Sequence, residues 1–337
     1  MATVESASGA PYARILGIGA YRPSRVIPNS EVVEAIDSSD EWIQQRSGIK
    51  QRRWATPDET VQMMSVSAAR EAIERAGIAP AQIDCVVVAT VTHLLQTPAI
   101  ATAIAHELGT ENAAAFDISA ACAGFCHGVS LGADMVRGGS AGHVLVIGVE
   151  RLSDLTDLYD RGTAFIFADG AGAAVVGPSD TPAIGPVVWG SDGEQFELIR
   201  QKEDWRDVVG TPAVPGSGVM PHLVMEGNPV FRWASFAMAK IGQQALDRAG
   251  VTAEDLDVFV PHQANMRIID AMARSMKLPE RVKIARDIAE QGNTSAASIP
   301  LALHRMIEEG DARSGDTALL IAFGAGLAYA AQVVTVP

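Results

Sequence analysis

Asp117-Ile-Ser-Ala-Ala-Cys122-Ala-Gly-Phe125 is the stretch around which the rest of the chain is organised. The apolar residues 113–118 predict a short buried strand, and from Cys122 to Gly138 apolar side chains recur at helical spacing. Only small residues join these two segments. The sequence therefore predicts a strand, a tight elbow and a helix whose first turn carries Cys122.

The position of Cys122 favours a reactive sulfur. Free amides and the dipole at a helix N-terminus favour the thiolate over the thiol, and the neighbouring side chains are too small to cover it. A buried structural cysteine is the alternative, because free cysteines are commonly packed in cores. Cys126 and His127 could also suggest a metal corner, but no second Cys/His pair stands at zinc spacing.

The composition indicates a large apolar chain with an acidic balance. Its 337 residues are 48% hydrophobic and 20% charged, which suffices for one large domain or two fused halves. A net charge of −14 argues against nucleic-acid binding by the overall field. Three cysteines without disulfide spacing fit a reducing cytoplasm. We find no secretory signal pattern and no apolar run of the roughly 18 residues that a membrane helix needs.

Strand and helix patterns alternate, which predicts an α/β fold with at least partly parallel sheets. The predicted strands cover 13–21, 83–91, 113–118, 143–149, 171–176, 256–260, 318–323 and 329–336. The predicted helices cover 29–36, a short segment capped by Asp40, 65–76, 98–108, 122–138, 229–249, 266–276 and 298–309. Residues 1–12 are expected to form a flexible tail, and 178–228 to form connectors or a surface insertion.

The second half of the chain repeats the first. Residues 72–77 and the strand after them resemble residues 245–250 and the strand after those, at an offset of 173. The stretch 119–122 aligns with 295–298 at an offset of 176, and each opens a helix. A near-constant offset indicates duplicated halves, whose equivalent loops can converge on one site.

Three polar segments of the second half could join the reactive cysteine. Pro-His262-Gln-Ala-Asn follows a strand, and the C-terminal ends of strands are where open α/β sheets place sites. Gly-Asn293-Thr-Ser-Ala-Ala-Ser is a polar turn into a helix. Phe-Gly-Ala325-Gly-Leu could present a backbone N–H to an oxyanion. The alternatives are a structural histidine, N-capping by Thr294 or Ser295, and a hairpin turn.

Together these motifs resemble those of the thiolase-like condensing enzymes that use Cys, His and Asn. Further motifs, at 40–43, 46–49, 160–163 and 169–173, make the chain similar to the β-ketoacyl-acyl carrier protein synthase III family from about Ala13 to Pro337. The resemblance implies a layered αβαβα fold, with two duplicated βα halves whose stacked mixed sheets surround central helices. We place the half with the cysteine at 13–180 and the half with His and Asn at 181–337.

The resemblance also implies the chemistry, which starts type II fatty acid synthesis. Cys122 takes the acyl group of an acyl-CoA, and His262 and Asn293 stabilise the enolate formed when malonyl-acyl carrier protein loses carbon dioxide. The amides of Cys122 and Ala325 form the oxyanion hole, although Ala325 stands where some relatives carry Gly. CoA thioester is a substrate, and neither a bound cofactor nor a metal is implied.

By the same resemblance, Trp42 stacks the adenine of CoA, while Arg46, Arg161 and Arg267 line the route of its pantetheine and phosphates. Surface salt bridges and core packing are the alternatives. An acidic carrier protein needs a local basic patch on this acidic chain, or else these charges form only a solvated helix face. Residues 267–286 supply such a patch, with Arg267, Arg274, Lys277, Arg281, Lys283 and Arg286.

The acyl pocket is the least defined part of the expected site. In this family the segment 92–98 contributes to it across a dimer interface, and Thr97 in a gating position would admit longer or branched primers. A cytoplasmic homodimer is expected. The competing interpretations are a related acyltransferase or ketosynthase of secondary metabolism, a non-catalytic scaffold and a cysteine hydrolase.

Overall fold

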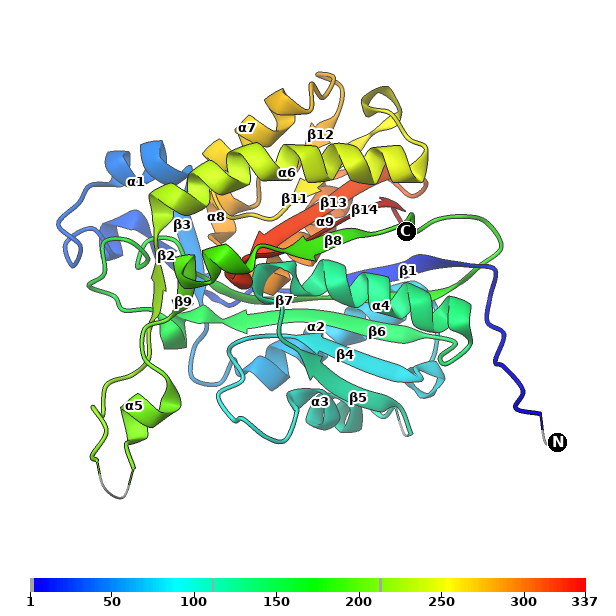
Figure 1. Ribbon diagram of the computed structural model, residues 1–337, viewed down its shortest axis with the longest axis horizontal. Coiled ribbons are helices and arrows are strands. Elements are labelled where there is room, and N and C mark those ends of the chain that lie inside the picture. The colour runs from blue at the N-terminus through cyan, green and yellow to red at the C-terminus, as the bar shows by residue number, and fades with distance from the viewer. Residues whose placement is uncertain (1–2, 111, 212–213) are drawn as a thin grey trace.

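Two five-stranded mixed sheets frame the molecule (Figure 1), described for residues 3–110, 112–211 and 214–337 of a computed structural model. The first sheet, in the order β1-β7-β6-β4-β5, contains β1 (Tyr12–Tyr21), β4 (Cys85–Ala89), β5 (Ala114–Ile118), β6 (Val144–Arg151) and β7 (Asp169–Ser179). The second, in the order β12-β11-β13-β14-β8, contains β8 (Val188–Ser191), β11 (Val258–Pro261), β12 (Lys283–Ile284), β13 (Thr317–Gly324) and β14 (Ala328–Thr335).

The two sheets repeat one pattern of strand directions. In the first sheet β5, β4 and β6 run parallel, and β7 and β1 follow antiparallel. In the second, β12, β11 and β13 run parallel, and β14 and β8 follow antiparallel. The predicted boundary between the halves, after residue 180, lies between β7 and β8.

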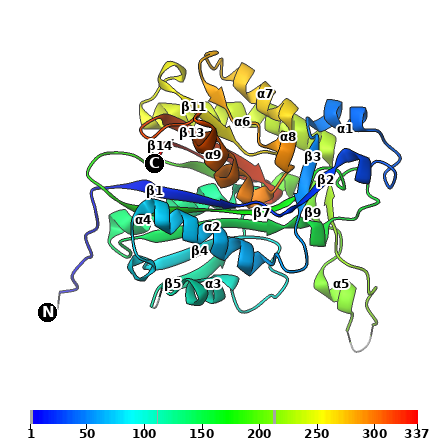
Figure 2. The ribbon, with the colours of Figure 1, turned by 180° about the vertical axis from the view of Figure 1, so that it is seen from behind.

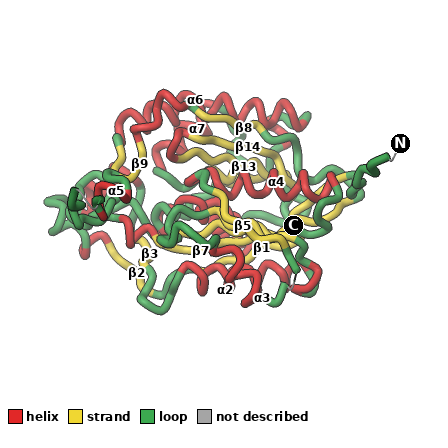
Figure 3. The backbone as a smooth tube through the Cα atoms, turned by 60° about the horizontal axis from the view of Figure 1, so that its bottom comes forward, coloured by secondary structure: helices red, strands yellow, loops and turns green. Residues whose placement is uncertain are grey.

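Helices cover both outer faces of the sheets and fill the space between them (Figures 1 and 3). The helices are α1 (Asp40–Ser47), α2 (Val61–Ala76), α3 (Ile100–Leu108), α4 (Gly124–Gly138), α5 (Trp205–Val209), α6 (Gly227–Ala249), α7 (Met266–Ser275), α8 (Ile288–Gln291) and α9 (Ser298–Glu309). Two small antiparallel pairs, β2 (Arg25–Pro28) with β3 (Gln51–Trp54) and β9 (Ile199–Gln201) with β10 (Leu223–Met225), lie outside the main sheets.

Three apolar cores give the layers. The central core packs α4 and α9 between the sheets, with side chains such as Phe125, Val129 and Leu303 fully buried. A second core joins α2 and α3 to the outer face of the first sheet, and a third joins α6 and α7 to the second sheet. Figure 2 shows the same layering from behind. The αβαβα fold expected from the sequence is therefore confirmed.

Equivalent elbows precede the two central helices. Short 3-10 turns, Ala121–Ala123 and Ser295–Ala297, run directly into α4 and α9, and their first residues have positive φ of 45° and 47°. Ala121 therefore matches Ser295, at an offset of 174. The predicted pairing of 119–122 with 295–298 was wrong by two residues, because a run of small residues fits either register.

Each elbow packs on a strand of the opposite half. A Cβ on Gly324, at the end of β13, would lie 2.6 Å from the backbone nitrogen of Cys122. A Cβ on Gly148, in β6, would collide with the carbonyl oxygen of Ala296. Glycine permits both close approaches, and they bring the cysteine elbow beside the loops of the second half.

Some sequence predictions were wrong in detail. The helix expected at 29–36 is only a 3-10 turn, Asn29–Glu31, because the Asn29 amide donates to Asp40 and to the Ile49 carbonyl instead of capping a helix. The segment 178–228 contains β8 of the second sheet as well as connectors. In the predicted tail, residues 3–11 lack helix and strand, and residues 1–2 lie outside the described ranges. Within those ranges no helix is both long and apolar enough to cross a membrane.

Candidate active site

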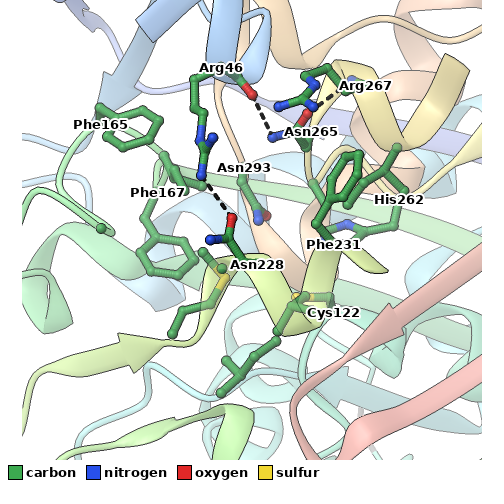
Figure 4. Close-up of a pocket in the computed structure, with 18 of the residues that line it drawn as sticks. Arg46, Cys122, Phe165, Phe167, Asn228, Phe231, His262, Asn265, Arg267 and Asn293 are labelled. Carbon is green, nitrogen blue, oxygen red and sulfur yellow. Dashed lines mark hydrogen bonds between the residues drawn. The ribbon is translucent and has the colours of Figure 1, made fainter. Parts of the chain in front are cut away.

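One pocket of about 440 Å³ is lined by the three residues predicted to be catalytic (Figure 4). Cys122 reaches it from the first elbow, His262 from the end of β11, and Asn293 from the turn before the second elbow. The same pocket is lined by the four residues predicted to bind CoA, namely Trp42, Arg46, Arg161 and Arg267. Duplicated halves thus converge on one cavity, as the offset of the repeat predicts.

A second pocket of about 440 Å³ lies against the same cysteine. Cys122 lines both cavities, and Ala325 lines the second one. Its apolar wall includes Leu94, Leu95, Leu152, Leu155, Phe167, Trp205 and Leu223. Thr97 is exposed in this single chain, and the neighbouring residues 93–96 line the pocket instead.

His262 is buried and held by one serine. Its Nδ1 lies 2.7 Å from Oγ of Ser298, the first residue of α9, and only 3% of the histidine is exposed. Burial lowers the pKa of His262 to about 3, so the imidazole is neutral near pH 7. The serine hydroxyl can donate or accept, which keeps Nε2 available in either tautomer as a proton acceptor or donor.

Asn293 is fixed at three points. Its backbone nitrogen donates to the Ile166 carbonyl at 2.9 Å, and its carbonyl accepts from Ala168 at 2.9 Å, so the first half holds the turn. Its side-chain Oδ1 accepts from the Ser295 amide at 2.8 Å. Because the oxygen is engaged, the amide nitrogen Nδ2 remains as the donor. Neither Thr294 nor Ser295 caps α9 with its side chain.

Cys122 does not rest as the predicted thiolate. It lies in the 3-10 turn before α4, and burial raises the pKa of its thiol to about 12. The Ser295 hydroxyl and the cysteine's own amide lower that pKa, while the Glu150 carboxylate raises it further. Desolvation outweighs the local donors, so the resting sulfur is a thiol. The nearby neutral imidazole of His262 is the group able to accept its proton.

The CoA residues make contacts other than ion pairs. The Arg161 guanidinium lies 5.0 Å from the centroid of the Trp42 ring, and Phe165 meets that ring edge-on at 5.3 Å. The Arg267 guanidinium lies 4.8 Å from the centroid of the Phe231 ring. The half-buried Trp42 ring, with an exposed guanidinium over its face, suits a planar base.

Arg46 is tied to the second half of the chain. Its guanidinium donates to Oδ1 of Asn228 at 2.9 Å, and its carbonyl accepts from the side-chain amide of Asn265 at 3.0 Å. Among the described residues, Arg46, Arg161 and Arg267 form no ion pair. Three cations therefore stay available at the mouth of the pocket.

The predicted docking patch is partly neutralised. Three of its six cations form ion pairs: Arg281 with Asp257 at 3.0 Å, Lys283 with Asp311 at 3.2 Å, and Arg286 with Asp270 at 2.8 Å. In the described part of the chain, Arg267, Arg274 and Lys277 have no such partner. The available positive charge is thus concentrated on α7 and the residue after its C-cap.

Several residues of the site escaped the sequence analysis. Phe231 looks like an ordinary helix residue in the sequence, Asn228 falls in the predicted connector segment, and Ser298 marks only the start of a helix. The fold brings Phe231 and Asn228 to the pocket and Ser298 to His262. Glu150 gave a signal that could have been used. It is a charged residue at the end of the otherwise apolar strand β6, and it is fully buried.

Two stacked mixed sheets around paired central helices, with a cysteine from one half facing a histidine and an asparagine from the other, define a thiolase-like condensing enzyme. Comparison with known proteins makes this more specific. A family model described as 3-oxoacyl-[acyl-carrier-protein] synthase III matches residues 116–193, and the model of its C-terminal part matches 246–336. The chain belongs to the 3-oxoacyl-[acyl-carrier-protein] synthase III family and is an acyl-transferring condensing enzyme.

The similar proteins are matched along their whole length. The β-ketoacyl-[acyl-carrier-protein] synthase III of Streptomyces glaucescens is 61% identical over 100% of both chains. The mycobacterial β-ketoacyl-[acyl-carrier-protein] synthase III of Mycobacterium marinum is 53% identical over 100% of this chain and 99% of its own. The solved priming β-ketosynthase of the R1128 polyketide pathway is 50% identical, with a TM-score of 0.95 and coverage of 100% and 99%. The resemblance seen in the motifs is confirmed.

Proposed function

We propose that the protein transfers an acyl group from acyl-CoA to Cys122 and condenses it with malonyl-acyl carrier protein. The products are 3-oxoacyl-acyl carrier protein, CoA and carbon dioxide. One observation carries the proposal: Cys122 lines two cavities, one that also holds His262, Asn293 and the unpaired arginines, and one whose wall is built largely of leucines. A sulfur in that position can hold an acyl chain on one side while carrier substrates enter from the other.

The first half-reaction forms the acyl-enzyme. The thiol proton of Cys122 passes to Nε2 of His262, and the sulfur attacks the thioester carbonyl. The tetrahedral oxyanion is stabilised by the backbone amides of Cys122 and Ala325, each near the start of a 3-10 turn where N–H groups lack partners within the turn. The C–S bond to CoA breaks, and CoA leaves as a thiol with the proton from His262.

The second half-reaction makes the carbon–carbon bond. When the malonyl group loses carbon dioxide, negative charge develops on the thioester oxygen. For this step His262 is in its other neutral tautomer, in which Nδ1 accepts from the Ser298 hydroxyl and Nε2 carries the proton. Nε2–H of His262 and Nδ2–H of Asn293 are the donors for that enolate, because the other polar atom of each side chain is already bonded. The enolate carbon then attacks the acyl carbonyl, the C–S bond to Cys122 breaks, and the sulfur recovers a proton.

The substrates approach through the cation-lined pocket. We assign adenine to the face of Trp42 now covered by Arg161, so that Arg161 lifts to close over the base, while Arg46 and Arg267 meet the phosphates. The acidic carrier protein docks on Arg267, Arg274 and Lys277. Arg281 belonged to the predicted patch, but its charge is already paired with Asp257. No bound cofactor enters the reaction.

Two further properties are proposed from the family. The enzyme works in the cytoplasm, in keeping with its free cysteines. It also works as a homodimer, in which Thr97 reaches the acyl pocket of the partner subunit and takes a gating position there. Because threonine is small, this arrangement admits branched or longer primers.

A polyketide role is the second candidate. The solved protein with a TM-score of 0.95 is a priming ketosynthase of a polyketide pathway, and it performs its task within the same fold. The two candidates differ in the primer and in the carrier protein that receives it, and a transferase acting on another acceptor would omit the condensation altogether.

The experiment is a product assay with a primer panel. Purified protein is mixed with malonyl-acyl carrier protein and with acetyl-, isobutyryl- or longer acyl-CoA, and carrier products are identified by mass. We expect 3-oxoacyl-carrier protein and one CoA released per condensation. Acylated protein that yields no 3-oxo product with any primer would overturn the proposal and favour the transferase.

A further inference from the structure

A buried carboxylate lies behind the nucleophile. Glu150 is the last residue but one of β6, is fully buried, and has no cationic partner in the hydrogen-bond network that the structure describes. Its Oε2 accepts from Oγ1 of Thr92 at 2.8 Å and from the amide of Val91 at 3.1 Å. Burying a carboxylate without a cationic partner costs free energy of folding, so a role for this residue in the function would explain its presence.

The remaining oxygen of this carboxylate faces the second elbow. Oγ of Ser295 lies 3.2 Å from Oε1 of Glu150, and Ser295 lines the same pocket as Cys122, whose thiol pKa its hydroxyl lowers. A serine hydroxyl has one proton to donate. The two acceptors, Glu150 and Cys122, therefore compete for the single O–H of Ser295.

We propose that Glu150 is a positioning residue that sets the reactivity of Cys122 by accepting or giving up the hydrogen bond from the Ser295 hydroxyl. When the carboxylate is ionised, it binds that O–H and adds a negative charge near the sulfur, and both effects oppose the thiolate. When it is protonated, Ser295 turns its O–H to the sulfur and the thiolate becomes more accessible. The proposal rests on the proposed role of Cys122 as the acyl carrier.

Of the groups packed around Glu150, Ser295 is the one through which its charge state can act on Cys122. On its own strand Arg151 turns to Asp154, and on β7 Asp169 binds the backbone and hydroxyl of Ser153. The near end of β4 and the Ser295 turn offer only hydroxyls and amides. α2 and α4 turn buried apolar side chains to β6, and the one titratable group among them, Cys126, is perturbed by burial alone.

Protonation of Glu150 falls in an accessible range. Burial raises the pKa of Glu150 to about 7, against the lowering effect of Thr92, Val91 and Ser295. His262, across the pocket, stays neutral at that pH, because burial lowers its pKa to about 3. Between about pH 5 and pH 9 the charge of this carboxylate therefore changes next to the sulfur, while that of His262 does not.

Alkylation by iodoacetamide tests the proposal without any acyl substrate. The rate constant at Cys122, read from the mass of its peptide, is measured from about pH 5 to pH 9, where it follows the thiolate fraction. For the native protein we expect the logarithm of the rate constant to rise with pH along two parallel lines. The line above pH 7 lies about one logarithmic unit below the extension of the line under pH 7, because Glu150 ionises between them. Glu150→Gln should give a straight line, with alkylation about tenfold faster above pH 7.

Two further variants make the result decisive. Asp169→Asn removes another fully buried carboxylate, on the neighbouring strand, and should keep the step near pH 7. Ser295→Ala should slow alkylation below pH 7, where the native hydroxyl turns to the sulfur, and change it little above pH 7, where the hydroxyl binds Glu150; it remains a test if Glu150→Gln does not fold. Alanine fits that backbone, because Ala121 adopts the same positive φ in the first elbow.

The possible outcomes separate the two proposals. A step that persists in Glu150→Gln, or equal behaviour of Glu150→Gln and Asp169→Asn, would overturn the role of Glu150 and leave the condensing reaction intact. Failure of the native protein to be acylated by any acyl-CoA, while the step near pH 7 is present, would overturn the proposed function and not the coupling.

Discussion

Nδ1 of His262 lies 2.7 Å from Oγ of Ser298, and this contact joins the end of β11 to the first residue of α9. The hydrogen bond at Nδ1 fixes the orientation of the imidazole ring and leaves Nε2 free to meet the substrate. Cys122 enters the same cavity from the opposite half of the fold. The site is therefore assembled from two elbows that the duplication places face to face.

Ser298→Ala should weaken catalysis while the histidine stays in place. Losing the bond to Nδ1 leaves a buried ring nitrogen unsatisfied and the ring free to turn, at a cost of about 1–3 kcal/mol. We expect the condensation rate to fall about tenfold or more. Ser298→Thr, which keeps the hydroxyl, should restore most of the rate. Equal loss in both variants would show that packing at the start of α9, rather than the hydrogen bond, is what matters.

Asn293→Asp should separate the half-reactions. A carboxylate offers no donor to the enolate and repels its charge, so malonyl decarboxylation should fall by about 10²–10³-fold. Acylation of Cys122 should stay within a few-fold of the native rate, because the oxyanion hole for that step consists of backbone amides. The two steps are measured as carbon dioxide release and as single-turnover acylation. Equal loss in both would contradict this division of roles.

Reversing the charges of Arg274 and Lys277 should affect only the carrier substrate. With both changed to Glu, the KM for malonyl-acyl carrier protein should rise about tenfold, and less at high salt, because the attraction is screened. The matched control reverses Lys240 and Arg248, an exposed lysine and arginine of α6 that form no ion pair among the described residues. A similar rise in the KM for acyl-CoA, or in the control pair, would count against a docking patch.

Acid should destabilise the fold through His262. Below about pH 6.5 the unfolded chain protonates this histidine, whereas the folded chain resists until about pH 3. As the pH is lowered through that window, the free energy of unfolding should therefore decrease by about 1.4 kcal/mol per pH unit, relative to His262→Ala. Denaturant titrations of both proteins measure the difference. A difference that does not change with pH would mean that folding leaves the pKa of this histidine unshifted.

The sequence predicted the helices and strands that form the layers of this fold more accurately than the turns that connect them. Helices such as α9 and strands such as β13 follow from periodicity, and the repeat placed both halves. The elbow register was missed by two residues, since only the positive φ of Ala121 and Ser295 distinguishes it from its neighbours. The supposed helix at 29–36 failed because Asn29 forms tertiary hydrogen bonds instead of a cap.

The same reasoning applies to the site. Cys122, His262 and Asn293 were recognisable because each sits in a local motif where an element begins or ends. Glu150 offered one local signal, a charge in an apolar strand, but its bond to Ser295 could not be predicted, because Ser295 is 145 residues away and the bond exists only after the halves dock. The ionisation of Cys122 was misjudged for a related reason. The helix start is visible in the sequence, but the burial that outweighs it arises from packing.

Peptide mass spectrometry of the acyl-enzyme tests the central claim most directly. The protein is treated with acyl-CoA alone, digested and mapped, and a second sample receives malonyl-acyl carrier protein before digestion. The account predicts one acyl group on the Cys122 peptide, none on Cys85 or Cys126, and its loss to the 3-oxoacyl-carrier product in the second sample. An acyl group on another residue, or one that water removes as fast as the carrier substrate does, would contradict it.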